Sequence, residues 1–577
     1  MYEASLGSFD KSETRTQTIS LDARYNFKPN LYVTAQGAYT TARGTSDVFL
    51  SPSSNAFAST TVLSQKGQYT LGNTGTDDWS AKLVGNWIHN FDTDGTMLTL
   101  NLGGEIKRSD SYSRTLVATG FLSDDLADIA YATSYSNNVP PSGSESLSAS
   151  VGAFAAANFV WKNRYFVDGS YRLSGSSKFG ANNQYAPFWS AGAGYNLHNE
   201  EFIKKLGWVN TLRLRTSYGY TGSVKFDAYQ AVSTYHYVSD YVHLGGVGAV
   251  PYAMSNPDLT WQTTKKFNVG ITSSFLGDRL NANFDYYNEV TDDMLIDVSL
   301  PPSSGATNVK NNFGSQVSNG FEYSLWGKII KIKDWEWNLT VNGLHSKTEI
   351  RDISDALKRK NEANAAVNTE SAPRLQYREG ESPTAIYAVR SAGIDPASGK
   401  EIYIKKDGTY TYTYDVNDQV SVGDTNPWMQ GSISSLLMYK QFSLSLNFSY
   451  RFGGDLYNST RAAKVENINP QQNVDVRAFA DRWKKPGDVV PYLNIQTTGN
   501  RTFMYSDRFV EKDNELWLSS VNLQYNLPEA WAKAIRAQKV YAGVGAEDLF
   551  RLNTAKYERG TTYPYSRSIN FSFSVTF

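Results

Sequence analysis

Side chains able to do chemistry are few in this chain and widely separated. The histidines are His89, His198, His236, His243 and His345, and the chain has no cysteine. None of the histidines stands in the His-Glu-x-x-His spacing of a zinc enzyme, and a zinc site without cysteine needs ligands far apart in sequence. No Gly-x-Ser-x-Gly motif of a serine hydrolase occurs either. The sequence therefore predicts no catalytic site, no metal site and no cofactor, and we do not expect an enzyme.

Aspartates gather in two polar stretches and suggest a second kind of chemistry, calcium binding. The two groups are Asp292, Asp293 and Asp297, and Asp407, Asp415 and Asp418. Their spacing is not that of a calcium-binding loop, which closes with a glutamate. We favour solvated loop acids, and calcium binding stays the alternative.

Aromatic residues in long polar segments are a stronger functional signal. One group surrounds a glycine-rich stretch and consists of Tyr235, Tyr237, Tyr241 and Trp261. Another alternates along the chain as Tyr410, Tyr412 and Tyr414. Flat rings offer apolar faces to sugar C–H groups or peptide side chains, and a polar edge for hydrogen bonds. We expect the first group to bind a substrate, and packing of one loop against another is the equal alternative.

The end of the chain predicts the element that carries such loops. Ile569, Phe571, Phe573, Val575 and Phe577 alternate strictly with polar residues. A strand turns successive side chains to opposite faces, so this segment has one apolar and one polar face. A strand of about ten residues that is apolar outward and polar inward is the unit of a transmembrane β-barrel.

The same alternation recurs along the chain in roughly 17 windows, from 17–27 and 31–41 to 539–547 and 567–577. Short turns between windows alternate with long polar loops, which are 42–78, 108–148, 221–265, 292–320, 346–431 and 452–514. Outer-membrane barrels have short periplasmic turns and long outer loops. The predicted fold class is therefore all-β, an antiparallel transmembrane β-barrel of the outer-membrane type.

Composition agrees with a barrel. The chain has 577 residues without an internal linker, and a barrel absorbs such length by adding strands. Aromatic residues make up 14%, which suits the girdles at the two membrane interfaces. Mean hydropathy is −0.44, and no apolar run is long enough for a spanning helix. A net charge of −1 argues against a nucleic-acid surface.

Several pattern details give sharper expectations. Residues 98, 100 and 102, and 442, 444, 446 and 448, should face lipid. Asp168 and Arg172 share a polar strand face, where we expect a salt bridge that belongs to the lumen wall or faces the plug, rather than a substrate site. The terminal strand should pair with 539–547.

Counting back from a periplasmic end, strand 17–27 runs downward, whereas a complete barrel has an even number of strands and starts upward. The first ten residues also lack the basic start and apolar stretch of a signal peptide. We therefore expect residues 1–577 to form the C-terminal part of a barrel, with its first strands and plug domain absent.

Short motifs in collinear order resemble one family. Residues 212–222 read Leu-Arg-Leu-Arg-Thr-Ser-Tyr-Gly-Tyr-Thr-Gly, and 256–264 read Asn-Pro-Asp-Leu-Thr-Trp-Gln-Thr-Thr. Further on, 482–488 read Arg-Trp-Lys-Lys-Pro-Gly-Asp, and 523–528 read Leu-Gln-Tyr-Asn-Leu-Pro. These segments resemble SusC/RagA-type TonB-dependent outer-membrane transporters along nearly the whole chain.

The resemblance implies a barrel of about 22 strands with a plugged lumen, about five more than the windows counted here. It implies active import of a glycan or oligopeptide across the outer membrane of a Gram-negative bacterium. It also implies a SusD-like surface lipoprotein over the outer mouth, TonB acting through the missing N-terminal part, and a terminal strand recognised by the insertion machinery. The alternatives are a passive porin-like channel, which the odd strand count opposes, and a barrel-anchored adhesin or enzyme, which no catalytic constellation supports.

Overall fold

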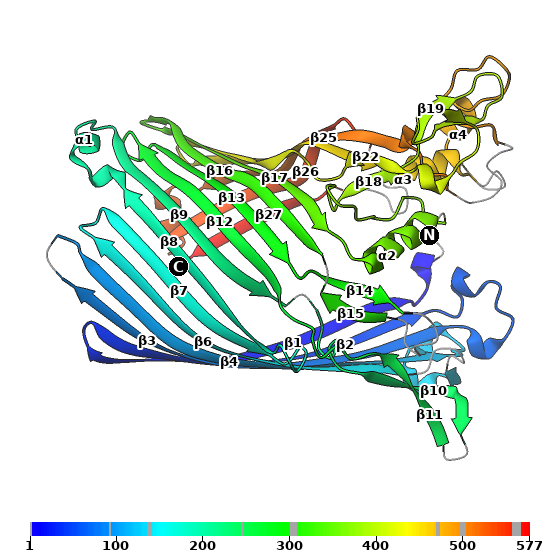
Figure 1. Cartoon of the computed structure of the whole chain (residues 1–577), viewed down its shortest axis with the longest axis horizontal. Coiled ribbons are helices and arrows are strands. Elements are labelled where there is room, and N and C mark those ends of the chain that lie inside the picture. The colour runs from blue at the N-terminus through cyan, green and yellow to red at the C-terminus, as the bar shows by residue number, and fades with distance from the viewer. Residues whose placement is uncertain are drawn as a thin grey trace.

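The computed structural model shows one antiparallel sheet that curls into a barrel wall (Figure 1). It describes residues 3–91, 94–135, 141–224, 226–243, 246–300, 308–312, 314–367, 369–468, 474–495, 503–556 and 567–577. The sheet has 18 strands there, of which β5 (Ser134–Tyr135) only extends the end of β4, so that 17 strands form the wall. The predicted fold class and strand number are confirmed.

Each wall strand pairs with the next one along the wall. The first nine are β1 Phe9–Lys28, β2 Leu31–Leu50, β3 Gln68–Asn90, β4 Met97–Thr119, β6 Ser142–Trp161, β7 Tyr165–Ser176, β8 Tyr185–Asn196, β9 Val209–Ser223 and β12 Gln262–Phe275. The other eight are β13 Leu280–Asp292, β16 Ser315–Ile332, β17 Trp335–Asp352, β23 Met429–Tyr439, β24 Phe442–Tyr457, β25 Val510–Asn526, β26 Lys539–Asn553 and β27 Ile569–Thr576.

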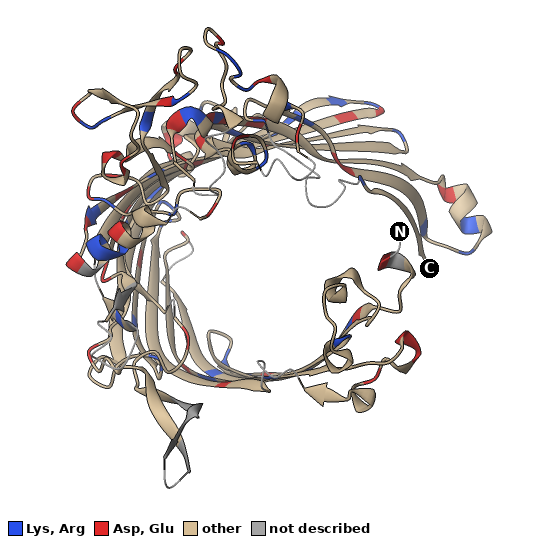
Figure 2. Ribbon diagram, turned by 90° about the vertical axis from the view of Figure 1, so that its right-hand side faces the viewer, with Lys and Arg blue, Asp and Glu red and all other residues tan. Residues whose placement is uncertain are grey.

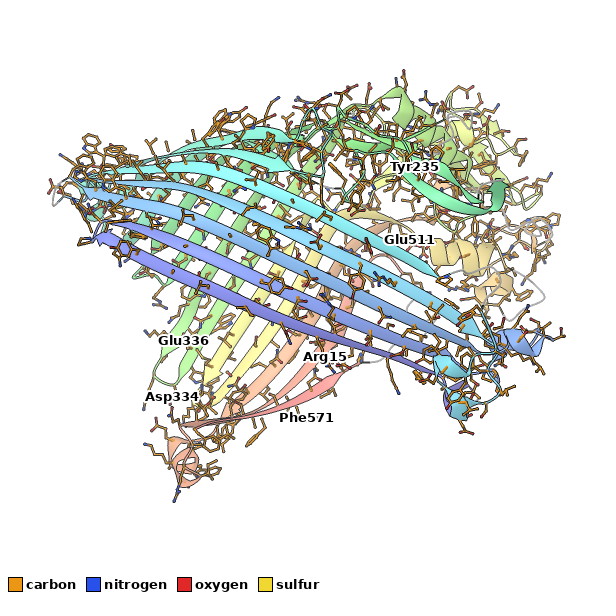
Figure 3. All side chains as sticks on the ribbon, turned by 90° about the horizontal axis from the view of Figure 1, so that it is seen from below. Arg15, Tyr235, Asp334, Glu336, Glu511 and Phe571 are labelled. Carbon is orange, nitrogen blue, oxygen red and sulfur yellow. The ribbon has the colours of Figure 1, made fainter. Side chains whose placement is uncertain are left out.

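The two ends of the sheet remain separate. No pairing joins β1 to β27 among the described residues, and the ring in Figure 2 is open where the two chain ends lie. Figure 3 labels Arg15 on β1 and Phe571 on β27, the two edge strands. The terminal strand pairs with β26 from Lys539↔Thr576 to Ala546↔Ile569, as predicted.

Connections at one end are short, and those at the other end are long. The short end holds tight turns, η6 (Leu197–Asn199), α1 (Glu201–Lys204) and α5 (Glu529–Ala534). The long end begins with η1 (Glu3–Ser5), η2 (Asn55–Phe57), η3 (Leu63–Gln65), η4 (Asp124–Leu126) and η5 (Ile129–Tyr131), followed by the strand pairs β10 (Thr234–His243) with β11 (Gly246–Ala253) and β14 (Leu295–Ser299) with β15 (Asn308–Asn312). No helix in the described part of the chain is long and apolar enough to cross a membrane.

The first strands are longer than predicted. β1 and β2 have 20 residues each, and β3 and β4 have 23. Predicted loop 42–78 therefore shrinks to 51–67, and 108–148 shrinks to 120–141. Beyond the apolar band both faces are polar, as where Arg43 on β2 pairs with Asp77 on β3 at 2.7 Å. The alternation of apolar and polar residues is lost there while backbone pairing continues. Strands predicted from that alternation are therefore too short.

The predicted register is confirmed. Leu446 lies opposite Val521, Val521 opposite Ala546, and Ala546 opposite Ile569, so all four share the apolar face. Asn447 lies on the other face, where its side-chain amide donates to Ser520 Oγ at 2.9 Å. On β4, the Leu102 side chain is 65% exposed, whereas the opposite face of the strand carries Glu105, which pairs with Arg172.

Aromatic rows mark the two borders of the apolar face. Near the short turns, the rings of Trp335 and Tyr439 lie 4.3 Å apart. Toward the long loops, His345 lies 5.2 Å from Phe321 and 5.2 Å from Trp428. Trp335 and His345 are ten residues apart on β17. At about 3.4 Å per residue and a tilt of about 40°, that separation corresponds to roughly 25 Å, the height of a membrane-facing band.

Candidate functional site

Two of the long loops fold together into one body at the rim of the barrel, which we call the cap. It comprises the described parts of 353–428 and 458–509. Its elements are α2 (Asp355–Ala366), β18 (Ala385–Ala388), β19 (Arg390–Ile394), β20 (Glu401–Ile404), β21 (Tyr410–Thr411), η8 (Val416–Asp418), β22 (Val420–Asp424), α3 (Ser459–Arg461), η9 (Ala462–Glu466), α4 (Arg477–Ala480) and η11 (Asp507–Phe509) (Figure 1).

The cap has its own apolar core. Ile386 and Ala388 from the first loop pack with Val465, Tyr492 and Tyr505 from the second. The two loops are also joined through the backbone, because the Val389 amide donates to the Tyr505 carbonyl at 2.9 Å. Each loop therefore covers apolar surface of the other.

Buried charges lock the two loops together. Arg508 donates to both oxygens of Glu401, at 2.8 and 2.7 Å, and to Glu466 at 3.0 Å. Burial raises the pKa of Glu466 above its usual value, although Arg508 opposes the shift. Burial alone would lower the pKa of Arg508, but the charges of Glu401 and Glu466 outweigh it and raise that pKa. Arg508 also donates to the Pro491 carbonyl at 2.6 Å, so the three side chains are engaged in holding the cap together.

A second buried arginine holds the later loop in shape. Arg482 is 3% exposed and donates to the carbonyl groups of Ala478, Leu493 and Glu466 at 2.8, 2.9 and 2.8 Å. The sequence showed this arginine only as part of a family motif. Neither buried arginine carries a periodic signal, because its partners lie on other segments of the chain.

The cap tyrosines divide into exposed and packed rings. Tyr410 and Tyr412 are exposed, and the Tyr412 hydroxyl donates to Asp395 at 3.0 Å. Tyr414 instead packs edge-on against Tyr403, with ring centres 5.4 Å apart. Only the first two therefore offer ring faces to a partner or substrate.

The predicted substrate-binding aromatics lie on two different elements, the tyrosines on a hairpin strand and Trp261 in the loop before β12. Tyr235, Tyr237 and Tyr241 belong to β10, which pairs with β11 in a hairpin that points away from the barrel (Figures 1 and 2). Tyr235 is 65% exposed there. The side chains of Tyr237 and Tyr241 lie outside the described residues.

Trp261 corrects the prediction made for it. Its ring is 6% exposed and stacks on Phe179 at 4.1 Å, with Phe188 edge-on at 5.3 Å. These three rings form a buried cluster that ties the loop before β12 to β8. A ring covered on its faces cannot stack on a sugar, so Trp261 serves loop packing.

Several of the loop aspartates stabilise turns. Asp292 pairs with Lys265 at 3.0 Å, Asp407 accepts from Thr409 at 2.9 Å, and Asp415 accepts from the Asn417 amide at 2.8 Å. The side chain of Asp297 lies outside the described residues. In the described ranges no three His, Asp or Glu side chains gather around a position for a metal ion.

The inner wall below the cap is polar and carries paired charges. Arg215 bonds both oxygens of Asp285 at 2.5 and 2.6 Å. Arg172 pairs with Glu105 at 2.5 Å and not with Asp168, which accepts from Asn158 instead. The expected Asp168–Arg172 bridge is thus wrong, because Glu105 reaches Arg172 from β4 across β6.

Two hollows open on the wall. One of about 450 Å³ is lined by Lys107, Lys178 and several serines, and the other, of about 650 Å³, by Asp285, Glu322 and Trp517 among others. Hydroxyl, amide and charged groups of this kind can hydrogen-bond a polar cargo, and their arrangement offers no nucleophile paired with a base.

Known proteins match this arrangement. The family model for "TonB dependent receptor-like, beta-barrel" matches residues 2–468. TonB-dependent receptor P26 of Formosa agariphila is 25% identical over 96% of this chain and 57% of its own length. TonB-dependent receptor P39 of the same organism is 25% identical, over 65% of this chain and 39% of its own length. TonB-dependent receptor SusC of Bacteroides thetaiotaomicron is 24% identical, over 68% of this chain and 39% of its own length. The chain thus spans about two fifths to three fifths of these relatives.

Solved structures show the same fold. The structure of the RagAB peptide transporter superposes with a TM-score of 0.85 at 22% identity, covering 99% of this chain and 63% of that chain. The RagAB peptide importer in its open-open state gives a TM-score of 0.83, also at 22% identity, over 99% of this chain and 62% of that chain.

Proposed function

The chain belongs to the family of TonB-dependent-receptor-like β-barrels of the Gram-negative outer membrane, and we propose that it forms the wall and cap of an active nutrient importer. The observation that carries the proposal is a folded cap at the rim of a polar lumen wall. A polar wall suits passage of a hydrogen-bonding cargo, and a large ordered body at the mouth suits capture.

The proposed cargo is a glycan or an oligopeptide. RagAB, which shares the fold, is a peptide transporter. Both cargo types carry many hydrogen-bonding groups, which the Lys107 and Asp285 hollows could satisfy. No covalent step is proposed: the cargo is bound, released by rearrangement of a plug, and passed through the lumen. Tyr235, Tyr237 and Tyr241 remain candidate contacts only if their hairpin folds toward the mouth.

The proposed partner at the outer mouth is a SusD-like lipoprotein docked on the cap. Exposed apolar side chains on the cap would supply its contacts, and they include Val476, Phe479, Val489 and Tyr410. We also propose that residues 1–577 are part of a longer protein, since the match covers 57% of TonB-dependent receptor P26, and that TonB acts through the remaining part.

The two sheet edges need cover in the membrane. Unpaired backbone groups of β1 and β27 cannot be satisfied by lipid. We propose that further strands of the longer protein lie between them and close the barrel around the plug. The polar face of the wall would then contact the plug.

Uptake by cells tests the import function. A deletion strain complemented with the full-length gene should take up labelled oligosaccharides or oligopeptides only while TonB is present and the inner membrane is energised. A passive channel would instead let solutes of this size swell liposomes without TonB. Uptake that is independent of TonB would refute the proposal.

A further inference from the structure

Four arginines stand on the outward face of neighbouring strands, and we call them the arginine patch. They are Arg15 on β1, Arg43 on β2, and Arg108 and Arg114 on β4. Arg15 lies directly opposite Arg43 in the register. Arg108 is two residues beyond Ile106, which shares the apolar outward face with Leu102.

The patch begins where the apolar band ends. Tyr39 and Trp79 are opposite each other in the register, and both rings are exposed on the outward face. Arg108 lies opposite Trp79, and Arg43 lies four residues beyond Tyr39 toward the long loops. Aromatic rings at this height form the outer girdle of a barrel. The patch therefore lies at the level of the outer-leaflet headgroups.

Three of the four guanidinium groups have donors to spare. In the described part of the chain, Arg15 donates through Nε to Glu13 at 2.6 Å, and Arg108 donates through Nε to Asp110 at 3.0 Å. Arg114 reaches Glu145 only at 3.5 Å. All three arginine side chains are exposed, and exposed pairs of this type are weak. Their terminal N–H groups can thus meet a phosphate through two parallel hydrogen bonds.

The fourth arginine, Arg43, is held in place by its own hydrogen bonds. Arg43 bonds both oxygens of Asp77 and two backbone carbonyls, so its position is determined. Beside it the Tyr112 ring lies flat over Gly75, where an added Cβ would come within 2.3 Å of the ring. The Arg114 guanidinium lies 4.9 Å from the centre of that ring. The Tyr112 ring and the Arg43–Asp77 pair thus form a surface beside which the Arg114 guanidinium lies.

We propose that the arginine patch binds the phosphate groups of lipopolysaccharide, the phosphorylated glycolipid of the outer leaflet. Anionic headgroups are attracted to arginines at this depth. The neighbouring carboxylates of Glu13, Asp110 and Glu145 can share the divalent cations that accompany such phosphates. The inference depends on the outer-membrane location and not on the import function. Either proposal can therefore fail while the other is supported.

Co-purification tests the proposal. The full-length protein is extracted from outer membranes in mild detergent, and lipid A per protein is measured by mass spectrometry. The combined variant Arg15→Gln, Arg108→Gln and Arg114→Gln should retain at least fivefold less lipid A than the wild type. The matched control is Arg24→Gln, which lies on the inward face of β1, and it should retain the wild-type amount. Equal lipid A in the triple variant, or phospholipid in its place in the wild type, overturns the proposal.

A second measurement needs no variant. Delipidated wild-type protein is incubated with lipid A or with its dephosphorylated form, and retention after gel filtration is compared. We expect at least a fivefold preference for the phosphorylated form. Equal retention of the two forms would show that acyl chains alone cause binding.

Discussion

Tyr323 on β16 and Tyr450 on β24 meet hydroxyl to hydroxyl at 3.0 Å, although β17 and β23 lie between them. The contact is possible because the intervening strands carry Gly343 and Gly431 beneath the two rings. A Cβ built on Gly343 would lie 2.4 Å from the Tyr323 ring, and one on Gly431 would lie 2.6 Å from the Tyr450 hydroxyl. Two flat rings thus brace four strands near the outer border of the membrane.

Gly431→Ala should therefore destabilise the barrel by about 1–3 kcal/mol, since the added Cβ would lie 2.0 Å from the Asn342 carbonyl oxygen and 2.6 Å from the Tyr450 hydroxyl. Urea unfolding of the full-length protein in lipid vesicles measures the change. Gly37→Ala is the matched control, because a Cβ there meets nothing within 4 Å. Equal stability of the two variants would show that the Tyr450 ring and the β17 backbone at Asn342 both make room for the methyl group at no cost.

Leu446→Arg should cost about 2–4 kcal/mol because it places a charge on the lipid face near the middle of β24. Asn447→Arg, one residue on, faces the polar lumen and should be much milder. The same unfolding assay compares them. A larger cost at position 447 would mean that the two faces are exchanged.

Arg508→Met should open the cap. It leaves Glu401 and Glu466 buried without their cation, and breaking a buried pair in this way costs about 3–5 kcal/mol. Limited proteolysis should then cut within the two cap segments, 353–428 and 458–509, while the barrel strands stay protected. Arg374→Met removes an exposed pair with Glu370 and should leave the cap resistant.

The contribution of Glu466 to the stability of the cap should decrease as the pH rises from acid toward neutral. The pKa of Glu466 is raised in the folded state above its usual value of 4.5. The folded cap therefore holds this proton more tightly than the unfolded chain does. Its contribution is complete below the usual pKa and is lost as the pH rises through the folded pKa. Proteolysis rates across this range measure the effect, and Glu466→Gln should flatten the profile.

Deletion of 573–577 from the full-length protein should abolish surface exposure. The deletion removes about half of β27 and leaves Lys539 to Ala542 on β26 without their pairing partners. The family resemblance also implies that this strand is the signal for membrane insertion. Surface labelling of intact cells is the measurement. Normal labelling of the truncated protein would contradict the assignment.

The wall could be predicted from sequence, since its signal is local. Apolar and polar residues alternate around Phe571 and Leu446, and this alternation correctly predicts the sheet face on which each side chain lies. The strand ends could not be predicted, because Arg43 and Asp77 pair across strands where both faces are polar. Local pattern contains no information about such pairs.

The functional residues were harder to predict for a related reason. Trp261 looked like a binding residue because its sequence neighbours are polar, yet Phe179, far away in the chain, covers it. Arg508 gave no signal at all, since Glu401 lies over a hundred residues away. Sequence position alone does not show which loop residues face a cargo and which face another loop.

The shared core of the cap has a consequence for how such proteins diverge. Tyr505 and Arg508 belong to one loop, and Val389 and Glu401 belong to the other, so each loop holds hydrogen-bonding and charged partners of its counterpart. A chimaera that took only one of the two loops from a relative would contain either Arg508 or Glu401 buried without its partner. The heritable module is therefore the pair, 353–428 with 458–509, and recombination between relatives should exchange both segments together with the two strands that separate them.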